Sequence, residues 1–191
     1  ITSNGDQLLR LISDILDLSK IESNTMEFHF GEHSLHALLT DIYQAQRLCM
    51  PEGVLLRLDM PQADTPIITD ASRLNNLINN AAKFTDEGSI TFGFRSPQGC
   101  EQVELFVHDT GKGIAQEHLD RIFERFYKAD SFVKGVGLGL SICRTITEYL
   151  GGAISVESES GKGTRFTIQH PLSRPEAAPR REPAETAGMR Q

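Results

Sequence analysis

The sequence has no tryptophan and only three cysteines among its 191 residues. Cys49, Cys100 and Cys143 are far apart, odd in number and lack C-x-x-C spacing, which argues against a disulfide framework and predicts free thiols in a reducing compartment. No apolar run approaches the roughly 20 residues that a membrane-spanning helix needs, and no signal-peptide pattern follows Ile1. We therefore expect a piece of a longer protein, without a membrane segment of its own.

Basic residues are outnumbered by acidic ones, 19 to 26, and the net charge is −7. An acidic chain repels phosphate backbones, so nucleic acid is not an expected partner. With 39% hydrophobic and 24% charged residues, the composition is that of an ordinary soluble protein. The length predicts one domain of ordinary size with an appendage.

Residues 7–22 predict an amphipathic helix. Its broad apolar stripe comprises Leu8, Leu11, Ile15 and Leu18, widened by Leu9, Ile12 and Leu16. A stripe of this width favours a partner helix in a bundle or coiled coil, and the alternative is a helix packed on its own domain.

Strands and helices then follow in a partly segregated order. Ser34 is the predicted N-cap of a second helix, and Asp70 is the predicted N-cap of a third. The apolar face of the second helix comprises Leu35, Leu38, Leu39, Ile42 and Ala45. Period-2 and helical spacing predict strands at 54–60, 90–94, 103–108, 154–156 and 164–168, and helices near 122–126 and 139–150. The polar tail from 174 onward is predicted to be disordered. The expected fold is α+β, with one mixed sheet covered by helices on a single face.

The third helix carries an unusual polar face. Asn76, Asn80 and Lys83 lie at i, i+4 and i+7, so they share one side of the helix. An amide oxygen is a hard ligand for Mg²⁺, and a lysine one turn away suits a phosphate. The alternative is a solvated polar face.

The stretch D-T-G-K-G-I follows a strand directly. Asp109 ends that strand, and its carboxylate could accept a hydrogen bond from an exocyclic amino group such as that of adenine. Gly111 and Gly113 indicate that something comes close to the backbone, and they leave room for a flat ring. The alternative is a tight turn with a capping aspartate.

A glycine-rich run at 135–140 opens another helix. Backbone N–H groups at a helix start favour phosphate, and such a run permits a mobile flap. It fails the dinucleotide fingerprint G-x-G-x-x-G because residue 140 is Leu140, and G-K-G-T at 161–164 is not a Walker loop because Val156 stands at the first glycine position. The two commonest nucleotide folds are therefore not expected.

These motifs become specific when their order is considered. N-x-x-x-N-A-x-K-F-T is followed by D-x-G-x-G-I, I-F-E-R-F-Y, G-x-G-L-G-L and S-x-x-G-x-G-T-x-F. This order, over about residues 70–170, resembles the ATP-binding domain of sensor histidine kinases, a GHKL/HATPase family with N, G1, F and G2 boxes. Residues 8–22 look like the end of the second dimerisation helix of the same family.

The resemblance implies a Bergerat-type ATP fold, a two-layer α/β sandwich with an N-terminal helix from a dimerisation bundle. It implies that residues 1–24 end the dimerisation region, 25–172 form the ATP-binding catalytic domain and 173–191 form a disordered tail.

The resemblance also implies ATP and Mg²⁺ as cofactors, with a role for each matching residue. It assigns Mg²⁺ to Asn80, supported by Asn76, and the phosphates to Lys83 and Lys128. It assigns the adenine amino group to Asp109, the adenine pocket to Gly111 and Gly113, and a polar contact near the adenine to Thr164. It assigns the anchoring of the flap to Phe123 and Phe126 and the closure of the flap to Gly135, Gly137 and Gly139. Phosphoryl transfer depends mostly on positioning and charge neutralisation, which this set offers.

The implied activity is transfer of the γ-phosphate of ATP to a histidine on a partner helix. Two alternatives remain: a GHKL-type ATPase that drives a clamp, and a nucleotide-binding module without phosphotransfer. The implied partners are the histidine-bearing dimerisation domain, a response regulator receiver domain and a second copy of the chain through residues 7–22. The implied location is the cytoplasmic, catalytic portion of a membrane-anchored sensor.

The sequence departs from the family pattern at two places. None of its six histidines precedes an acid in a helix upstream of L-L-R-L-I, so the phosphate acceptor is absent and we expect nucleotide binding without self-phosphorylation. The spacing between Arg73-Leu74 and Asn76 is about one helical turn shorter than in the family; four residues rotate a helix by about 400°, so the faces stay nearly in phase.

Overall fold

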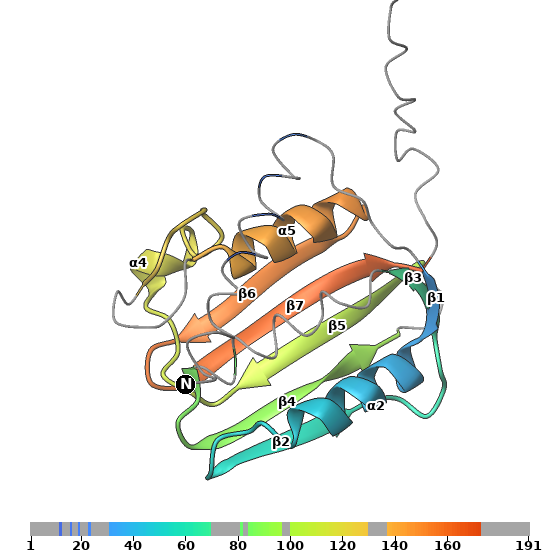
Figure 1. The fold of residues 1–191 in the computed structure, drawn as a ribbon, viewed down its shortest axis with the longest axis horizontal. Helices are drawn as coiled ribbons and strands as arrows, with labels where there is room; N and C mark the ends of the chain where they lie inside the picture. Colours follow the sequence, from blue (N-terminus) through green and yellow to red (C-terminus); the bar gives the residue numbers. More distant parts are fainter. Residues whose placement is uncertain are drawn as a thin grey trace, which may run out of the picture.

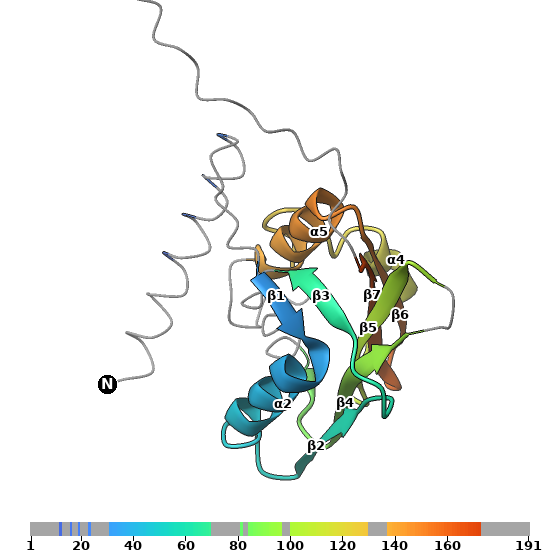
Figure 2. The same ribbon diagram turned by 90° about the vertical axis from the view of Figure 1, so that its right-hand side faces the viewer.

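A mixed five-stranded sheet forms the body of the protein (Figures 1 and 2). The computed structural model describes residues 12, 16, 19, 23, 31–69, 81, 84–96, 100–129 and 137–172. In the order β2-β4-β5-β7-β6 the strands are Val54–Asp59, Gly88–Arg95, Gln102–Asp109, Gly163–Pro171 and Ala153–Glu159. β2 and β4 are parallel and the other pairs are antiparallel, which confirms the mixed sheet.

Two helices cover one face of this sheet. α2 spans Leu35–Gln46 and α5 spans Gly139–Tyr149, and both lie on the same side of the strands (Figure 2). A second, two-stranded antiparallel sheet is formed by β1 (Gly31–Ser34) and β3 (Pro66–Thr69), which the sequence did not predict. The arrangement confirms the expected two-layer α+β fold.

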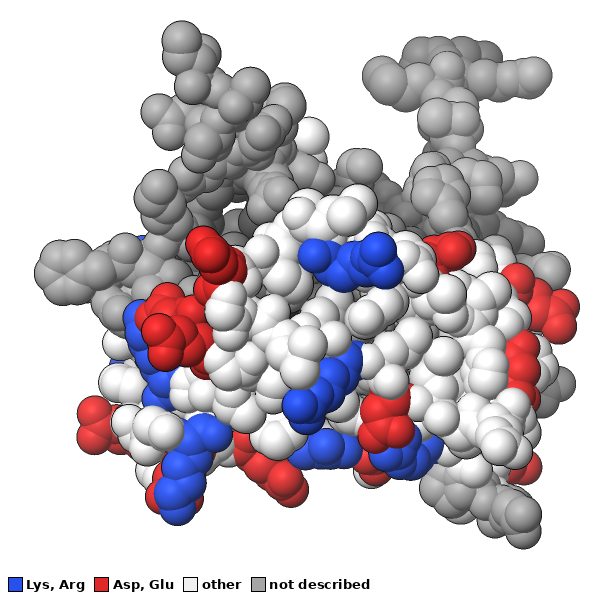
Figure 3. Space-filling view, turned by 90° about the horizontal axis from the view of Figure 1, so that it is seen from below, with Lys and Arg blue, Asp and Glu red and all other residues white. Residues whose placement is uncertain are grey.

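The opposite face of the sheet is polar, with one aromatic exception. Phe106 is 4% exposed although it points away from Val103, Leu105 and Val107 on the same strand. Two guanidinium groups cover its ring: those of Arg95 at 5.1 Å and Arg165 at 4.4 Å from its centroid. Figure 3 shows Lys and Arg interspersed with Asp and Glu over the side of the molecule seen from below, without a large patch of one sign.

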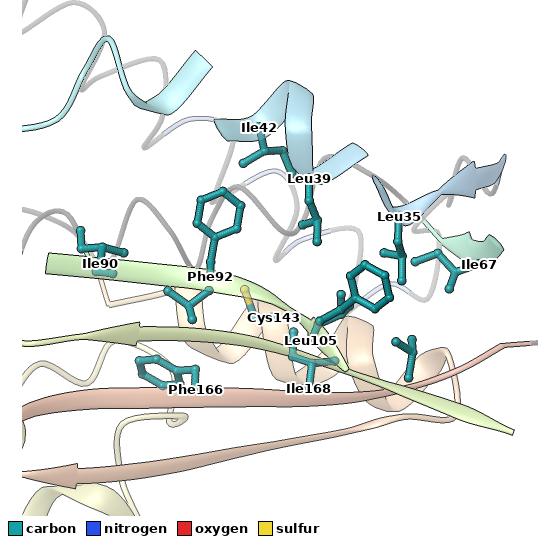
Figure 4. Packing of buried hydrophobic residues seen from close by; sticks show 14 of the residues in the cluster. Leu35, Leu39, Ile42, Ile67, Ile90, Phe92, Leu105, Cys143, Phe166 and Ile168 are labelled. Carbon is teal, nitrogen blue, oxygen red and sulfur yellow. The ribbon is translucent and has the colours of Figure 1, made fainter. Parts of the chain in front are cut away.

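The hydrophobic core lies between the sheet and its two helices (Figure 4). Ile90, Phe92 and Phe94 are at most 1% exposed, because alternate residues of a strand point to the same face. The burial of each such side chain contributes about 1.5–3 kcal/mol. From the α2 side, Leu35, Leu39 and Ile42 complete the core.

The predicted N-cap of α2 is confirmed. The Ser34 hydroxyl accepts a hydrogen bond from the backbone N–H of Ala37 at 3.1 Å. This satisfies one of the free N–H groups of the first helical turn, a contribution of about 1 kcal/mol. Ala45, expected on the apolar face, is exposed at the last turn.

Two expectations about helices have other outcomes. The helix expected near 122–126 is wrong: α4 covers only Gln116–Leu119, and turns and bends follow as far as Phe126. The sequence signal was two aromatic residues at helical spacing, which irregular chain also uses to reach a core. The helix from Asp70, most of the helix over 7–22 and the tail after 172 lie outside the described residues. In the part of the chain that the structure describes, no helix is long and apolar enough to cross a bilayer.

A buried histidine joins the small sheet to the large one. His170, 4% exposed, has Nδ1 2.7 Å from the carbonyl of Pro171 and Nε2 3.1 Å from the Thr69 hydroxyl. A carbonyl only accepts, so Nδ1 carries the proton, and Nε2 accepts from the hydroxyl in the neutral ring. Burial lowers the pKa of His170, against the opposing effect of the Pro171 hydrogen bond.

The free energy of unfolding should depend on pH through the protonation of His170. Above the unfolded-state pKa of about 6.5 the ring is neutral in both states. As the pH falls, the unfolded chain binds its proton first, so the free energy of unfolding should decrease until the lowered folded pKa is passed. Urea unfolding between pH 8 and pH 5 measures this, and His170→Gln should flatten the curve. Replacement of the exposed His108 by Gln should leave the wild-type slope; equal flattening by both changes would contradict the assignment.

Candidate functional site

The site is built around a carboxylate at the end of β5. Asp109 is 3% exposed, and its neighbours in the flanking strands are Ile90 and Thr164. The carboxylate accepts hydrogen bonds from the backbone N–H of Gly111, at 2.9 Å, and from that of Thr164. An ionised carboxylate has about four acceptor positions, so about two remain for a ligand.

Burial makes the charge of this carboxylate costly. It raises the pKa of Asp109, while the two backbone hydrogen bonds lower it without cancelling the effect. Because the folded pKa lies above the unfolded value, the contribution of this group to stability falls as the pH rises through it. The ionised carboxylate is thus an acceptor whose charge is costly to bury, and a ligand with an N–H donor would offset that cost.

The loop after Asp109 is attached by three hydrogen bonds at two of its residues. The N–H of Lys112 donates to the carbonyl of Phe84 (3.2 Å), and its carbonyl accepts from Gly161 N–H at 2.7 Å. The N–H of Ile114 donates to the Ser158 hydroxyl at 2.8 Å. The loop thus connects residue 84 with the turn between β6 and β7, and its conformation is set before any ligand arrives.

Other parts of the backbone leave no room for a side chain at the two glycines of the loop. A Cβ on Gly111 would overlap the carbonyl oxygen of Phe84, and one on Gly113, whose φ is +64°, would overlap that of Glu159. The close approach to the backbone that the sequence predicted is therefore present, but the approaching groups are the chain's own carbonyls. Their contact with adenine stays a prediction.

The end of β6 and the start of β7 lie beside Asp109 in the sheet. Thr164 is 5% exposed, and its hydroxyl lies 2.9 Å from that of Ser158. The sequence pointed to Thr164, whereas Ser158 was not given a role. The available signal was its position at the first residue of the S-x-x-G-x-G-T motif.

The two phenylalanines expected to anchor the flap differ. Phe123 packs edge-on against Phe166, with ring centroids 6.4 Å apart. Phe126 has a left-handed φ of 62° and a side chain 61% exposed. Its backbone N–H, rather than its ring, holds the segment by donating to the carbonyl of Gly137 at 3.0 Å. Phe123 therefore packs toward the core, whereas the Phe126 side chain is exposed; the anchoring of the flap by these residues stays a prediction, because residues 130–136 lie outside the described part of the chain.

The sequence analysis gave no role to Tyr127, which directly follows Phe126. Its hydroxyl lies 2.7 Å from Nδ1 of His118, and the guanidinium of Arg121 lies 4.3 Å from its ring centroid. Tyr127 also packs against the hydrophobic core. Lys128 directly follows it in the same irregular segment.

The predicted glycine-rich helix start is α5. Gly139 is its first residue, and Leu138 before it makes no side-chain capping hydrogen bond. The first N–H groups of this helix therefore have no side-chain cap and suit an anion such as phosphate. A Cβ on Gly137 would lie 2.6 Å from the carbonyl oxygen of Tyr127. Gly135 lies outside the described residues.

The proposed metal ligands Asn76 and Asn80, together with Lys83, lie outside the described residues. Two residues of the same predicted helix are described, Ala81 and Phe84, and both are helical. The carbonyl of Phe84 contacts the Asp109 loop, as described above. Phe84 therefore lies against this loop, and the approach of Asn76, Asn80 and Lys83 to the same loop stays a prediction. Among the described residues, no group of three His, Cys, Asp or Glu side chains is arranged to hold a metal.

The amino-acid sequence has relatives among sensor kinases. The chain is 37% identical over 182 residues to the autoinducer 2 sensor kinase/phosphatase LuxQ of Vibrio cholerae, and the match covers 89% of this chain and 21% of that protein. It is 34% identical over 180 residues to the sensor histidine kinase RcsC of Escherichia coli, which covers 89% of this chain and 19% of that protein. The chain thus spans about a fifth of the length of these relatives.

Solved structures of histidine kinases share the fold of this chain and part of its sequence. Full-length ShkA in complex with AMPPNP superposes with a TM-score of 0.78 at 29% identity, over 93% of this chain and 38% of that one. The catalytic domain of the histidine kinase ThkA superposes with a TM-score of 0.63 at 28% identity, over 77% of this chain and 97% of that domain. Residues 72–174 match the family described as histidine kinase-, DNA gyrase B- and HSP90-like ATPases. The chain therefore belongs to this ATPase family, and the relatives and solved structures compared above are sensor or histidine kinases.

Proposed function

We propose that the domain binds ATP with Mg²⁺ and donates the γ-phosphate to a histidine on a dimerisation helix of the full-length kinase. The observation that carries the proposal is the buried carboxylate of Asp109, held by two backbone donors with acceptor positions to spare. It is the acceptor that an adenine amino group requires. The AMPPNP bound by the related ShkA is an adenine nucleotide, which supports the same ligand here.

The other named residues would hold the phosphates and the metal. The first N–H groups of α5 lack a side-chain cap and suit the phosphate chain. Asn80, with Asn76, would ligate Mg²⁺, and Lys83 and Lys128 would neutralise phosphate charge. When bound, Mg²⁺ would supply further neutralisation of phosphate charge and help to orient the phosphates. The chain's own part is therefore positioning and electrostatics.

The proposal extends to the rest of the signalling protein. Residues 1–24 would end a dimerisation region and residues 25–172 would form the catalytic domain. A receiver domain would take the phosphate from the histidine, and the full-length protein would place this domain at the cytoplasmic side of a membrane. The names of two relatives, a sensor kinase/phosphatase and a sensor histidine kinase, support a place for the domain in a signalling kinase.

A transfer assay tests the function. The chain is incubated with γ-labelled ATP and Mg²⁺, alone and with a separate dimerisation fragment that bears the acceptor histidine. We expect acid-labile label on the added fragment and none on the chain itself. Steady phosphate release without transfer would support a clamp-type ATPase instead, and binding alone would support a module without transfer.

The metal role of Asn80 has its own expected result. Asn80→Ala should lower ATP affinity in the presence of Mg²⁺ by about tenfold or more, because a ligand to the metal is lost. With EDTA in place of Mg²⁺, wild type and variant should bind ATP equally. Titration calorimetry measures both conditions. An unchanged affinity and unchanged metal dependence would remove the metal role from Asn80.

A further inference from the structure

The Ser158 hydroxyl contacts three groups beside Thr164 and its ladder partner Asp109. It accepts from the N–H of Ile114 at 2.8 Å, donates to the carbonyl of Gly163 at 2.8 Å and lies 2.9 Å from the hydroxyl of Thr164. A serine hydroxyl has one proton and two lone pairs. The Gly163 carbonyl uses the proton, so the contact with Thr164 requires Thr164 to be the donor.

The direction of this hydrogen bond determines what Thr164 can offer to a ligand. Because the Thr164 proton points at Ser158, only lone pairs remain for any other group. Thr164 stands directly opposite Asp109 in the β5–β7 ladder, and directly opposed residues project to the same face of a sheet. A hydroxyl that can only accept thus lies next to a carboxylate that can only accept.

We propose that Ser158 is a positioning residue that makes the site selective for a purine with a 6-amino group. It does so by holding the Thr164 hydroxyl in its accepting orientation and by fixing the loop at Ile114. Two neighbouring acceptors suit an exocyclic amine with two N–H bonds and disfavour a carbonyl at the same position. This inference rests on the proposed function and adds to it the residue that sets base selectivity.

The loop attachment supports the same role. The carbonyl of Ser158 also accepts from the side-chain amide of Gln116 at 3.1 Å, so its backbone and its side chain both hold the segment after the loop. Removal of the hydroxyl would leave the Ile114 N–H without its acceptor and would free the Thr164 hydroxyl to rotate and donate. A base with a carbonyl at position 6 would then meet a donor.

Titration with ADP and with inosine diphosphate, which has a carbonyl in place of the amino group, tests the inference. Both titrations use the 191-residue chain with Mg²⁺. Wild type should prefer ADP strongly, because a polar site rejects a ligand that leaves its groups unpaired. Ser158→Ala should lower the ADP-to-IDP affinity ratio about tenfold, the effect of one hydrogen bond. Ser158→Thr keeps the hydroxyl and should restore the ratio.

Matched variants separate this role from a loss of stability. Ser160→Ala, at an exposed position of the same turn, should bind both nucleotides as wild type does. Thr164→Val should lower the ratio, and Ser158→Ala added to it should lower the ratio no further. A wild-type ratio in Ser158→Ala, or an equal loss of ADP and IDP affinity, would overturn the proposal.

Amide hydrogen exchange keeps the inference testable without a ligand. In the nucleotide-free chain, Ser158→Ala should speed exchange at the Ile114 amide at least about tenfold, because its acceptor is lost. Unchanged exchange would overturn the role of Ser158 in the loop. A wild type that binds neither nucleotide, with exchange still accelerated in the variant, would instead contradict the proposed function.

Discussion

Replacement of Asp109 by Asn should lower the affinity for ADP by about ten- to a hundredfold. The change keeps the size of the side chain but exchanges one acceptor oxygen for an NH₂ group, which cannot accept from an amino group. A hydrogen bond to a charged group contributes about 1.5–3 kcal/mol, and each 1.4 kcal/mol is about tenfold in affinity. Because an amide can donate to a carbonyl, IDP should lose less affinity than ADP.

The variant and its control are compared by calorimetric titration with ADP and IDP. Glu104→Gln, on the same strand and also an acid-to-amide change, is the matched control. Its carboxylate pairs with Arg165 at 3.4 Å in a partly exposed ion pair, which contributes little. Glu104→Gln should bind both nucleotides as wild type does. An Asp109→Asn chain that keeps the ADP affinity would remove this carboxylate from the binding site.

Replacement of Gly163 by Ala should destabilise the fold by about 3 kcal/mol or more. Gly163 has a φ of +106°, and a Cβ there would overlap the backbone carbonyl of Asp109. A left-handed φ costs about 1–2 kcal/mol for alanine, and overpacking adds about 1–3 kcal/mol. The clash would also displace the strand end that carries Asp109, so nucleotide affinity should fall with stability.

Gly161 provides a matched control in the same turn. Its φ is +80°, but no atom lies within 4 Å of the position that a Cβ would take. Gly161→Ala should therefore show only the conformational cost, about 1–2 kcal/mol. Urea unfolding of both variants measures the difference. Equal destabilisation would mean that the contact with the Asp109 carbonyl contributes nothing.

The strands of the large sheet were predictable because one face of each is buried. Ile90, Phe92 and Phe94 recur at every second position of β4, and the structure buries all three. β1 and β3 were missed because four residues contain too few alternations to form a pattern. The 122–126 segment was misread because Phe123 reaches the core from a turn, and a turn leaves no periodic signal.

For the site, the order of the motifs predicted the residues, but the contacts of those that are described required coordinates. Asp109 was predicted as a strand-end acceptor, and the structure places it there. Ser158 stands at the first position of the S-x-x-G-x-G-T motif, but its hydrogen bond with the Ile114 amide, 44 residues away in the sequence, could be found only from coordinates. The glycines show the same limit: the sequence predicted a close approach, but the approaching group was another part of the backbone.

The most direct test of the account is a crystal structure of the chain with ADP and Mg²⁺. It predicts the exocyclic amino nitrogen of adenine within about 3 Å of an Asp109 carboxylate oxygen, as a hydrogen bond requires. An adenine ring bound elsewhere, or an amino group facing solvent while Asp109 stays buried without it, would contradict the account.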